Sequence, residues 1–199
     1  MTTATRPRSE TAEQILDLAE TLIQTRGYCA FSYQDVADAL GVTKASIHYH
    51  FASKTDLGKA VVERYVQRFG RMLAQIAEDP QISSAHMLDR YFEPFLQLSE
   101  TADRVCLCGA LAGEVLAVPA ELRQRVDAFF SAHQAWLAEI LRRGVARGEF
   151  ELRAPAEQMS RVVFGALQGG LIVRRTTGDA SQLHDIVTAL KAQLTRPAS

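Results

Sequence analysis

Lys44, Ala45 and Ser46 stand together in a segment whose side chains suit contact with the edges of nucleic-acid bases. A lysine can donate to O6 and N7 of guanine, while a serine or an alanine can contact polar base edges or a thymine methyl group. Between Val42 and Lys59 the chain places three lysines and two histidines against one aspartate. Because phosphates require positive charge at the docking face and not over a whole domain, this segment is a candidate DNA-binding surface.

The residues around this segment predict a short helix, a tight turn and a second short helix. Ser32 and Asp35 fit a capping box, in which each side chain satisfies an unpaired backbone donor at the start of a helix. Gly41 stands where a left-handed residue would end that helix, and Thr43 can cap a second helix over residues 44–49. This order of elements is the helix-turn-helix, which places its second helix in the major groove of DNA.

Residues 41–57 also resemble the signature of the TetR family of bacterial transcriptional regulators. That signature runs Gly-Val-(Ser/Thr)-Lys-x-(Ser/Thr)-(Leu/Ile)-Tyr-x-(His/Tyr)-Phe-x-(Ser/Asn)-Lys-x-x-Leu. His48 departs from it, since a tyrosine is more usual there, and Tyr49 follows directly. The matching positions are Gly41, Val42, Thr43, Lys44, Ser46, Ile47, His50, Phe51, Ser53, Lys54 and Leu57.

The resemblance implies which side chains meet DNA. The start of the second short helix would approach base edges, and Tyr49, His50 and Lys54 would hold phosphates together with the helix N-terminus that Ser53 caps. Two alternatives stay open: His50 could be a buried histidine that satisfies a backbone group, and Lys54 could be a solvated charge. The predicted DNA-binding residues are Thr43, Lys44, Ala45, Ser46, His48, Tyr49, His50 and Lys54.

The chain of 199 residues can form one domain or two small ones. Helical spacing of apolar residues without a convincing strand predicts an all-α fold of about nine helices. The resemblance implies a three-helix helix-turn-helix head with an N-terminal arm at residues 1–53, and a helical body for effector binding and dimerisation at residues 54–199. Outside the two short helices, helices are predicted at 11–25, 54–78, 84–99, 103–117, 119–147, 155–177 and 180–194.

Composition is that of an ordinary soluble globular protein, with 47% hydrophobic and 23% charged residues and a net charge of −1. No apolar run approaches the ~20 residues needed to span a bilayer, so no membrane partner is expected. The first residues lack the apolar core of a signal peptide, and the odd number of cysteines argues against a disulfide framework. We therefore expect a cytoplasmic protein.

The resemblance further implies that the body binds a small-molecule effector, whose binding separates the two recognition helices of a dimer. Aromatic and methionine side chains with a few polar groups suit an apolar pocket, although at helical spacing they are more often plain core. The candidate pocket residues are Phe69, Met72, Met87, Tyr91, Phe95, Cys106, Leu107, Leu111, His133, Trp136 and Phe164.

Cys106 and Cys108 are candidates for thiol chemistry. Two residues apart on a helix, their side chains would point about 200° away from each other, which argues against an intrahelical disulfide or a shared metal. Cys106 lies near a predicted helix N-terminus and Arg104, both of which lower a thiol pKa. The segment also resembles a Gly-Cys-Leu stretch of an electrophile-sensing subgroup of the family. Buried packing is the alternative, because free cysteine is often buried, and it is the role expected for Cys29.

Small residues in the predicted helix 155–177 suggest a close helix–helix contact, since they reduce helix propensity and need a packing reason. The resemblance implies a homodimer in which the last two long helices of each chain form a four-helix interface. Packing within one chain is the alternative. A two-fold dimer would place two recognition helices on successive major grooves of a pseudo-palindrome. The predicted interface residues are Val162, Gly165, Ala166, Gly169, Leu171, Leu183, Ile186 and Leu190.

No metal-ligand cluster, nucleotide loop or credible triad is visible in the sequence, so we expect no cofactor, no metal and no catalytic residue. The expected function is DNA-binding transcriptional regulation, with a repressor released from a palindromic double-stranded operator by a small apolar effector or by cysteine modification. An activator also fits the sequence. The alternative from another class is a small all-α ligand-binding protein or enzyme that does not bind DNA.

Overall fold

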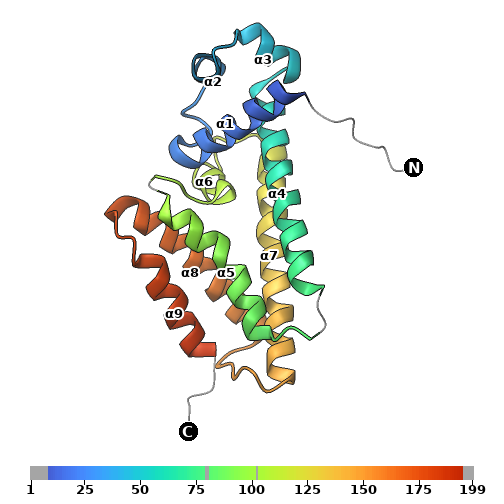
Figure 1. Ribbon diagram of the computed structural model, residues 1–199, viewed down its shortest axis with the longest axis vertical. Coiled ribbons are helices and arrows are strands. Elements are labelled where there is room, and N and C mark those ends of the chain that lie inside the picture. The colour runs from blue at the N-terminus through green and yellow to red at the C-terminus, as the bar shows by residue number, and fades with distance from the viewer. Residues whose placement is uncertain (1–8, 79–80, 102, 195–199) are drawn as a thin grey trace, which may run out of the picture.

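The computed structural model describes residues 9–78, 81–101 and 103–194, and these form nine α-helices and no strand (Figure 1). The predicted all-α class is confirmed. The N-terminal arm expected before residue 9 lies outside the described residues. The helices are α1 (Glu10–Arg26), α2 (Tyr33–Leu40), α3 (Lys44–His50), α4 (Lys54–Ala77), α5 (Ser84–Glu100), α6 (Leu107–Gly113), α7 (Ala120–Ala146), α8 (Ala156–Thr177) and α9 (Gln182–Leu194).

The first three helices form a head at one end of the molecule (Figure 1). The predicted capping box of Ser32 and Asp35 is present at the start of α2, and Gly41 ends this helix with a left-handed φ of 65°. At the start of α3, Thr43 Oγ1 accepts a hydrogen bond of 3.2 Å from the Ser46 N–H. The predicted order of helix, turn and helix is therefore confirmed.

Buried side chains from α2 and α3 hold the head together. Val36 and Ile47 have no exposed surface, and Phe51 extends the same core beyond the end of α3. The Tyr33 hydroxyl donates to the Phe51 carbonyl oxygen at 2.9 Å and so joins the start of α2 to the residue after α3. Since burying each large apolar side chain contributes about 1.5–3 kcal/mol, these contacts fix the orientation of α3.

The helix α4 leaves the head and runs along the body, where it packs against α5 and α7 (Figure 1). Its 24 residues correspond to a length of about 36 Å. On the other side of the body, α8 packs against both α7 and α9. Pro94 lies inside α5. One continuous helix therefore connects the head with the body, so a displacement of the body can reach α3.

The helix α6 is much shorter than the helix predicted over residues 103–117. It begins after Cys106, whose side chain makes no capping hydrogen bond, and it ends at Gly113. Residues 114–117 form turns instead. Two glycines, Gly109 and Gly113, lie within the seven residues of α6 and reduce the helix propensity of the segment, which accounts for its early end.

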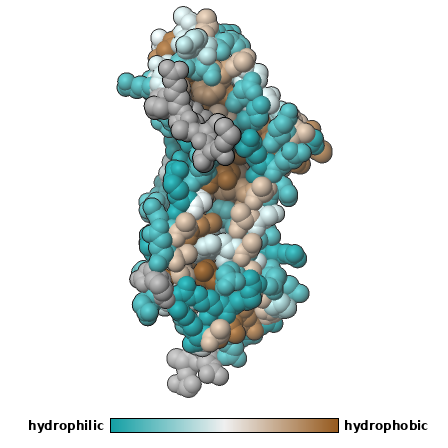
Figure 2. Space-filling model, turned by 90° about the vertical axis from the view of Figure 1, so that its right-hand side faces the viewer, coloured by the Kyte–Doolittle hydropathy of each residue, from teal (hydrophilic) through white to brown (hydrophobic). Residues whose placement is uncertain are grey.

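The surface is mostly hydrophilic but not uniform. On the side of the molecule that α4 lines, apolar surface shows in the middle of a largely hydrophilic face (Figure 2). Leu116, in the turns after α6, is 95% exposed. None of the helices in the described ranges is both long enough and apolar enough to cross a bilayer.

Candidate nucleic-acid interface

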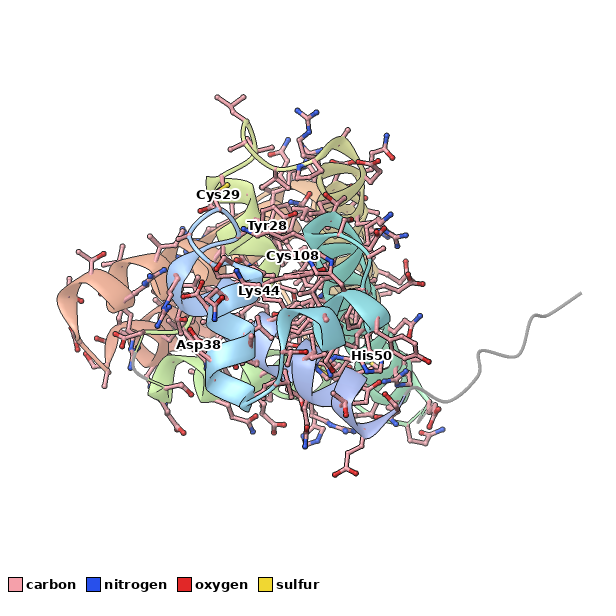
Figure 3. The ribbon with its side chains drawn as sticks, turned by 90° about the horizontal axis from the view of Figure 1, so that it is seen from above. Tyr28, Cys29, Asp38, Lys44, His50 and Cys108 are labelled. Carbon is pink, nitrogen blue, oxygen red and sulfur yellow. The ribbon has the colours of Figure 1, made fainter. Side chains whose placement is uncertain are left out.

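The outward face of α3 presents the side chains that were predicted to meet DNA. Lys44 and His50 mark the two ends of this helix in the view from above the head (Figure 3). Ile47 anchors the opposite side in the core, and Tyr49 is 85% exposed. The contact with DNA itself remains a prediction. Thr43, Lys44, Ala45, His48 and Tyr49 are exposed, and Ser46 and His50 are half-buried.

The two histidines of α3 are held by different contacts. The His48 ring lies edge-on to the Tyr33 ring with the centroids 4.8 Å apart, and its Nδ1 is 3.1 Å from the Ala52 carbonyl oxygen. This hydrogen bond requires the tautomer with the proton on Nδ1, which leaves Nε2 as an acceptor. His50 packs edge-on against Tyr49 at 5.1 Å. The histidine that departs from the family signature therefore stabilises the end of α3 while remaining at the surface.

In the structure Lys54 makes contacts within the chain, and the phosphate contact predicted for it stays a prediction. Its ammonium group donates to the Phe31 carbonyl oxygen and lies over two rings, 4.7 Å from the centroid of Tyr28 and 4.5 Å from that of Phe31. Burial lowers the pKa of Lys54. The side chain is not a solvated charge either, because it holds the loop after α1 against the start of α4.

The start of α4, where a phosphate was also expected, is occupied by its own acidic group. Ser53 Oγ accepts from the Asp56 N–H at 3.1 Å and donates to the Asp56 carboxylate at 2.7 Å. The Lys59 ammonium lies 2.7 Å from Asp56 Oδ1. Hydrogen bonds from Lys59 and Ser53 lower the pKa of Asp56, so this carboxylate is ionised at neutral pH. Its negative charge competes with a phosphate for the N-terminus of α4.

Head and body are joined by hydrogen bonds on both sides of α6. The Val105 N–H donates to the Gln24 carbonyl oxygen at 3.3 Å, and the Cys29 N–H donates to Glu114 Oε2 at 3.0 Å. Cys29 is exposed, so the packing role expected for it is wrong. Local desolvation and the Glu114 carboxylate raise the pKa of the Cys29 thiol. These contacts couple α1 and the loop after it to the body.

Several residues predicted to line an effector pocket meet in an aromatic cluster inside the body. The Tyr91 hydroxyl lies 3.0 Å from His133 Nδ1, and the Tyr91 ring stacks on Trp136 at 5.3 Å. Phe69 and Phe164 flank the His133 ring at 5.5 Å each. His133 Nε2 is buried without a hydrogen-bond partner among the described residues, and burial lowers the pKa of His133 to about 4. An unsatisfied buried nitrogen is rare in a plain core.

The rest of the predicted pocket is tightly packed interior. Of the predicted set, only Phe69 lines the cavity of about 270 Å³ that lies between α1, α4 and α5. Sequence reasoning missed the other lining residues, because they include polar groups such as Gln24, Gln97 and Arg104 that no apolar periodicity reveals. Met87, Phe95, Cys106, Leu107 and Leu111 are buried, and Met72 is half-buried.

Neither cysteine of the α6 region is exposed. Cys106 retains 2% of its surface and Cys108 none, and burial raises the pKa of Cys108 well above its usual value. The Cys106 sulfur lies 3.5 Å from the Tyr65 hydroxyl. The Arg104 guanidinium, expected beside the Cys106 thiol, donates instead to Thr21 Oγ1 at 3.1 Å. An oxidant could reach these thiols only after the surrounding helices move.

The helix α8 presents an exposed stripe of small and apolar residues, which we call the α8 stripe. Val162, Ile172 and Val173 are 51%, 53% and 45% exposed. Between them, a Cβ atom added at Gly165 or Gly169 would meet no described atom within 4 Å. Sequence reasoning missed Ile172 and Val173, although they follow Val162 at helical spacing, which would have identified them.

Three of the predicted interface residues are wrong. Leu171, Leu183 and Leu190 are buried in the core of the chain itself, so they are not available to a partner. Close packing of α8 also has a cause within one chain, since a Cβ atom at Gly170 would lie 2.6 Å from Ile186 Cδ1 of α9. The remaining predicted residues, Ala166 and Ile186, are half-buried.

Comparisons with known proteins agree with this architecture. Residues 15–61 match the profile of bacterial regulatory proteins of the tetR family, and residues 85–190 match the tetracyclin repressor-like C-terminal domain. A solved TetR-family regulator from Agrobacterium tumefaciens is 30% identical, with a TM-score of 0.88 over 94% of this chain and 98% of its own. A TetR regulator from Legionella pneumophila is 29% identical, with a TM-score of 0.85 over 96% of this chain and all of its own (100%).

A curated relative shows the same similarity over nearly the whole length. The transcriptional repressor DhaR from Mycobacterium sp. is 20% identical over 92% of this chain and 91% of its own. The two profiles together cover both the head and most of the body. The chain therefore belongs to the TetR family of bacterial transcriptional regulators, whose helix-turn-helix head binds DNA.

Proposed function

We propose that this regulator is a cytoplasmic repressor and not an enzyme: it binds a pseudo-palindromic operator as a homodimer and leaves it when a small apolar effector binds the body. The exposed face of α3 is the observation that supports this most directly. Lys44 and Tyr49 project from it, while Ile47 holds the helix from behind. A rigid helix with a cationic end and an exposed aromatic hydroxyl suits the major groove and its flanking phosphates.

Each exposed side chain of α3 has a definite partner on DNA in this proposal. Lys44 donates to O6 and N7 of a guanine, and Ala45 and Ser46 contact neighbouring base edges. Thr43, Tyr49 and His50 donate to phosphates and so set the register of the helix on the duplex. Affinity should fall steeply with salt, because phosphate contacts release counterions.

Dimerisation in this proposal uses the α8 stripe. Exposed valine and isoleucine side chains lie on either side of open glycines, so a second copy of α8 could approach closely and cover them. The interface joins equivalent surfaces and is therefore two-fold, as a pseudo-palindromic operator requires. The head at residues 1–53 reads DNA, and the body at residues 54–199 dimerises and binds the effector.

The effector site in this proposal is the aromatic cluster around Tyr91 and His133. The unsatisfied His133 Nε2 offers a ligand one hydrogen bond in apolar surroundings. An effector shifts the equilibrium only if it binds the released conformation more tightly than the DNA-bound one. Binding of this kind is favoured over cysteine modification, because Cys106 and Cys108 are both buried.

Fluorescence anisotropy with the DNA that flanks the gene, at stated salt, tests the proposal. Lys44→Ala and Tyr49→Ala should each weaken operator binding by about fivefold to 160-fold, the size expected for a lost contact of ~1–3 kcal/mol. Arg153→Ala removes one exposed positive charge from the segment between α7 and α8, which lies at the end of the molecule opposite the head, and should leave the affinity unchanged (Figure 1). All three variants should remain dimeric in light scattering. Unchanged affinity in both α3 variants would refute this docking surface.

A parallel titration with diamide separates the two release mechanisms. Binding that diamide abolishes and a thiol reductant restores would show cysteine sensing and would contradict the preference for an apolar effector. Binding indifferent to diamide agrees with the proposal and directs the search to neutral aromatic ligands that reach His133.

A further inference from the structure

A cavity of about 270 Å³ lies where the head meets the body, and the repressor mechanism above does not use it. Its walls come from α1 of the head, from α4 and α5, and from the segment that follows α5. Of these elements, α4 packs against both α1 and α5 and so connects the two sides of the cavity. The volume is close to the lower end of the ~300–1,000 Å³ found for small-molecule sites.

Glu20, the one acid among the described residues that line the cavity, is already paired with arginines. Glu20 Oε1 lies 2.5 Å from Arg68 Nη2, and Glu20 Oε2 lies 3.1 Å from Arg64 Nη2. The Glu20 side chain is only 11% exposed, while its partners Arg64 and Arg68 are 18% and 49% exposed. The Arg68 guanidinium also lies over the Tyr65 ring, 5.0 Å from its centroid. A cationic ligand would have to displace an arginine, which makes it a poor occupant.

Arg104 gives the cavity a positive charge that no acid balances. It is half-buried, and Nη2 donates to Thr21 Oγ1 at 3.1 Å. Within residues 9–78, 81–101 and 103–194, Arg104 forms no ion pair with a carboxylate. A guanidinium has five N–H donors in a fixed planar arrangement that matches a carboxylate. The side chains of Gln24 and Gln97 line the same cavity and add amide donors.

The cavity also has an apolar wall. Phe69 of α4 and Pro94 and Leu98 of α5 form this wall. An inorganic anion would leave the apolar wall in contact with water, and a neutral apolar molecule would leave Arg104 unpaired. An organic anion with one charged end and an apolar remainder satisfies both walls.

We propose that this cavity binds a small organic monocarboxylate, whose carboxylate pairs with Arg104 and whose apolar part packs on Phe69, Pro94 and Leu98. The ligand would touch α1 of the head and α5 of the body at once. Its binding therefore resists movement of the head relative to the body. If DNA binding changes that relative position, ligand and DNA must alter each other's affinity by the same factor.

Calorimetric titration of the full chain without DNA tests the site directly. The probes are benzoate and hexanoate, with benzamide as the neutral analogue, benzylamine as the cationic one and inorganic phosphate as the purely ionic one. We expect saturable binding of both carboxylates, and at least tenfold weaker binding of the other three probes. Arg104→Gln should weaken benzoate binding by about tenfold to a hundredfold, as expected for a lost charge-assisted hydrogen bond. Arg123→Gln makes the same charge change at an exposed position of α7 and should bind benzoate normally.

A second variant guards against misfolding of Arg104→Gln, which also loses the bond to Thr21. Gln97 lines the cavity and is exposed, so the variant Gln97→Glu should fold normally, which circular dichroism can verify. Its added negative charge should repel benzoate. The proposal is overturned if neither carboxylate binds, if benzamide or phosphate binds as tightly as benzoate, or if a folded Gln97→Glu variant binds benzoate as the wild type does. Because no DNA is present, none of these results depends on the operator.

Discussion

Protonation of His133 should set how the stability of this protein depends on pH. The His133 ring is buried between aromatic side chains, and burial lowers its pKa from an ordinary 6.5 to about 4. The folded protein therefore keeps this ring neutral at pH values where the unfolded chain already binds a proton. Above pH 6.5 the titration of His133 does not reduce the free energy of unfolding. This free energy decreases as the pH falls toward 4, because the unfolded chain binds a proton that the folded chain does not. At about 1.36 kcal/mol per pKa unit, the loss amounts to about 3 kcal/mol.

The perturbation that isolates this effect is His133→Phe, which keeps an aromatic ring but cannot titrate. Removing the partner of the Tyr91 hydroxyl costs about 1–3 kcal/mol at every pH. The pH-dependent contribution of His133 is therefore obtained as the difference between the free energies of unfolding of the wild type and the variant. The contributions of the other titrating groups cancel in this difference. This difference should change by about 3 kcal/mol between pH 7 and pH 4, with the wild type losing more.

Urea denaturation at fixed protein concentration, between pH 7 and pH 4, measures these free energies of unfolding. His86→Gln is the matched control, because His86 is an exposed histidine on α5. This variant should follow the wild-type pH profile. Parallel profiles for wild type and His133→Phe would refute the reasoning, since they would mean that His133 titrates alike in the folded and unfolded chain.

Three further predictions concern packing, capping and assembly. Gly144→Ala should destabilise the protein by about 1–3 kcal/mol in urea denaturation, because the added Cβ would lie 2.0 Å from the Phe150 ring, whereas Gly70→Ala on α4 meets open space and should not. Ser53→Ala removes the capping bond at the start of α4 and should lower the free energy of unfolding by about 1 kcal/mol, and a variant as stable as wild type would contradict that role. Val162→Glu places a charge in the α8 stripe and should yield a folded monomer in light scattering, while a persistent dimer would exclude the stripe from the interface.

Local signals made most of the head predictable from sequence. The capping residues Ser32, Thr43 and Ser53 each accept the expected backbone hydrogen bond, because such bonds depend on residues only three positions apart. The left-handed Gly41 is likewise a local requirement. The exposed face of α3 could be predicted for the same reason, since one buried residue, Ile47, determines the direction of its neighbours.

Roles that depend on distant partners were not predictable. The ammonium of Lys54 meets the Phe31 carbonyl oxygen only after α4 has docked beside the loop that follows α1. Leu183 carries the same apolar signal whether it packs within the chain or against a partner, so spacing could not separate these roles. Arg104 lies 83 positions from its partner Thr21, and the cavity that Arg104 lines combines polar residues of several elements.

We expect the exposed face of α3 to read a palindromic operator, and one binding measurement is enough to check this role. The wild-type protein is titrated by fluorescence anisotropy against duplexes from its own upstream region, at two salt concentrations. Each duplex contains either the candidate palindrome or the same bases in scrambled order. We expect tight, salt-dependent binding to the palindrome, and binding to the scrambled duplex weaker by at least about a thousandfold. Equal affinity for both duplexes, from a folded and dimeric protein, would contradict it.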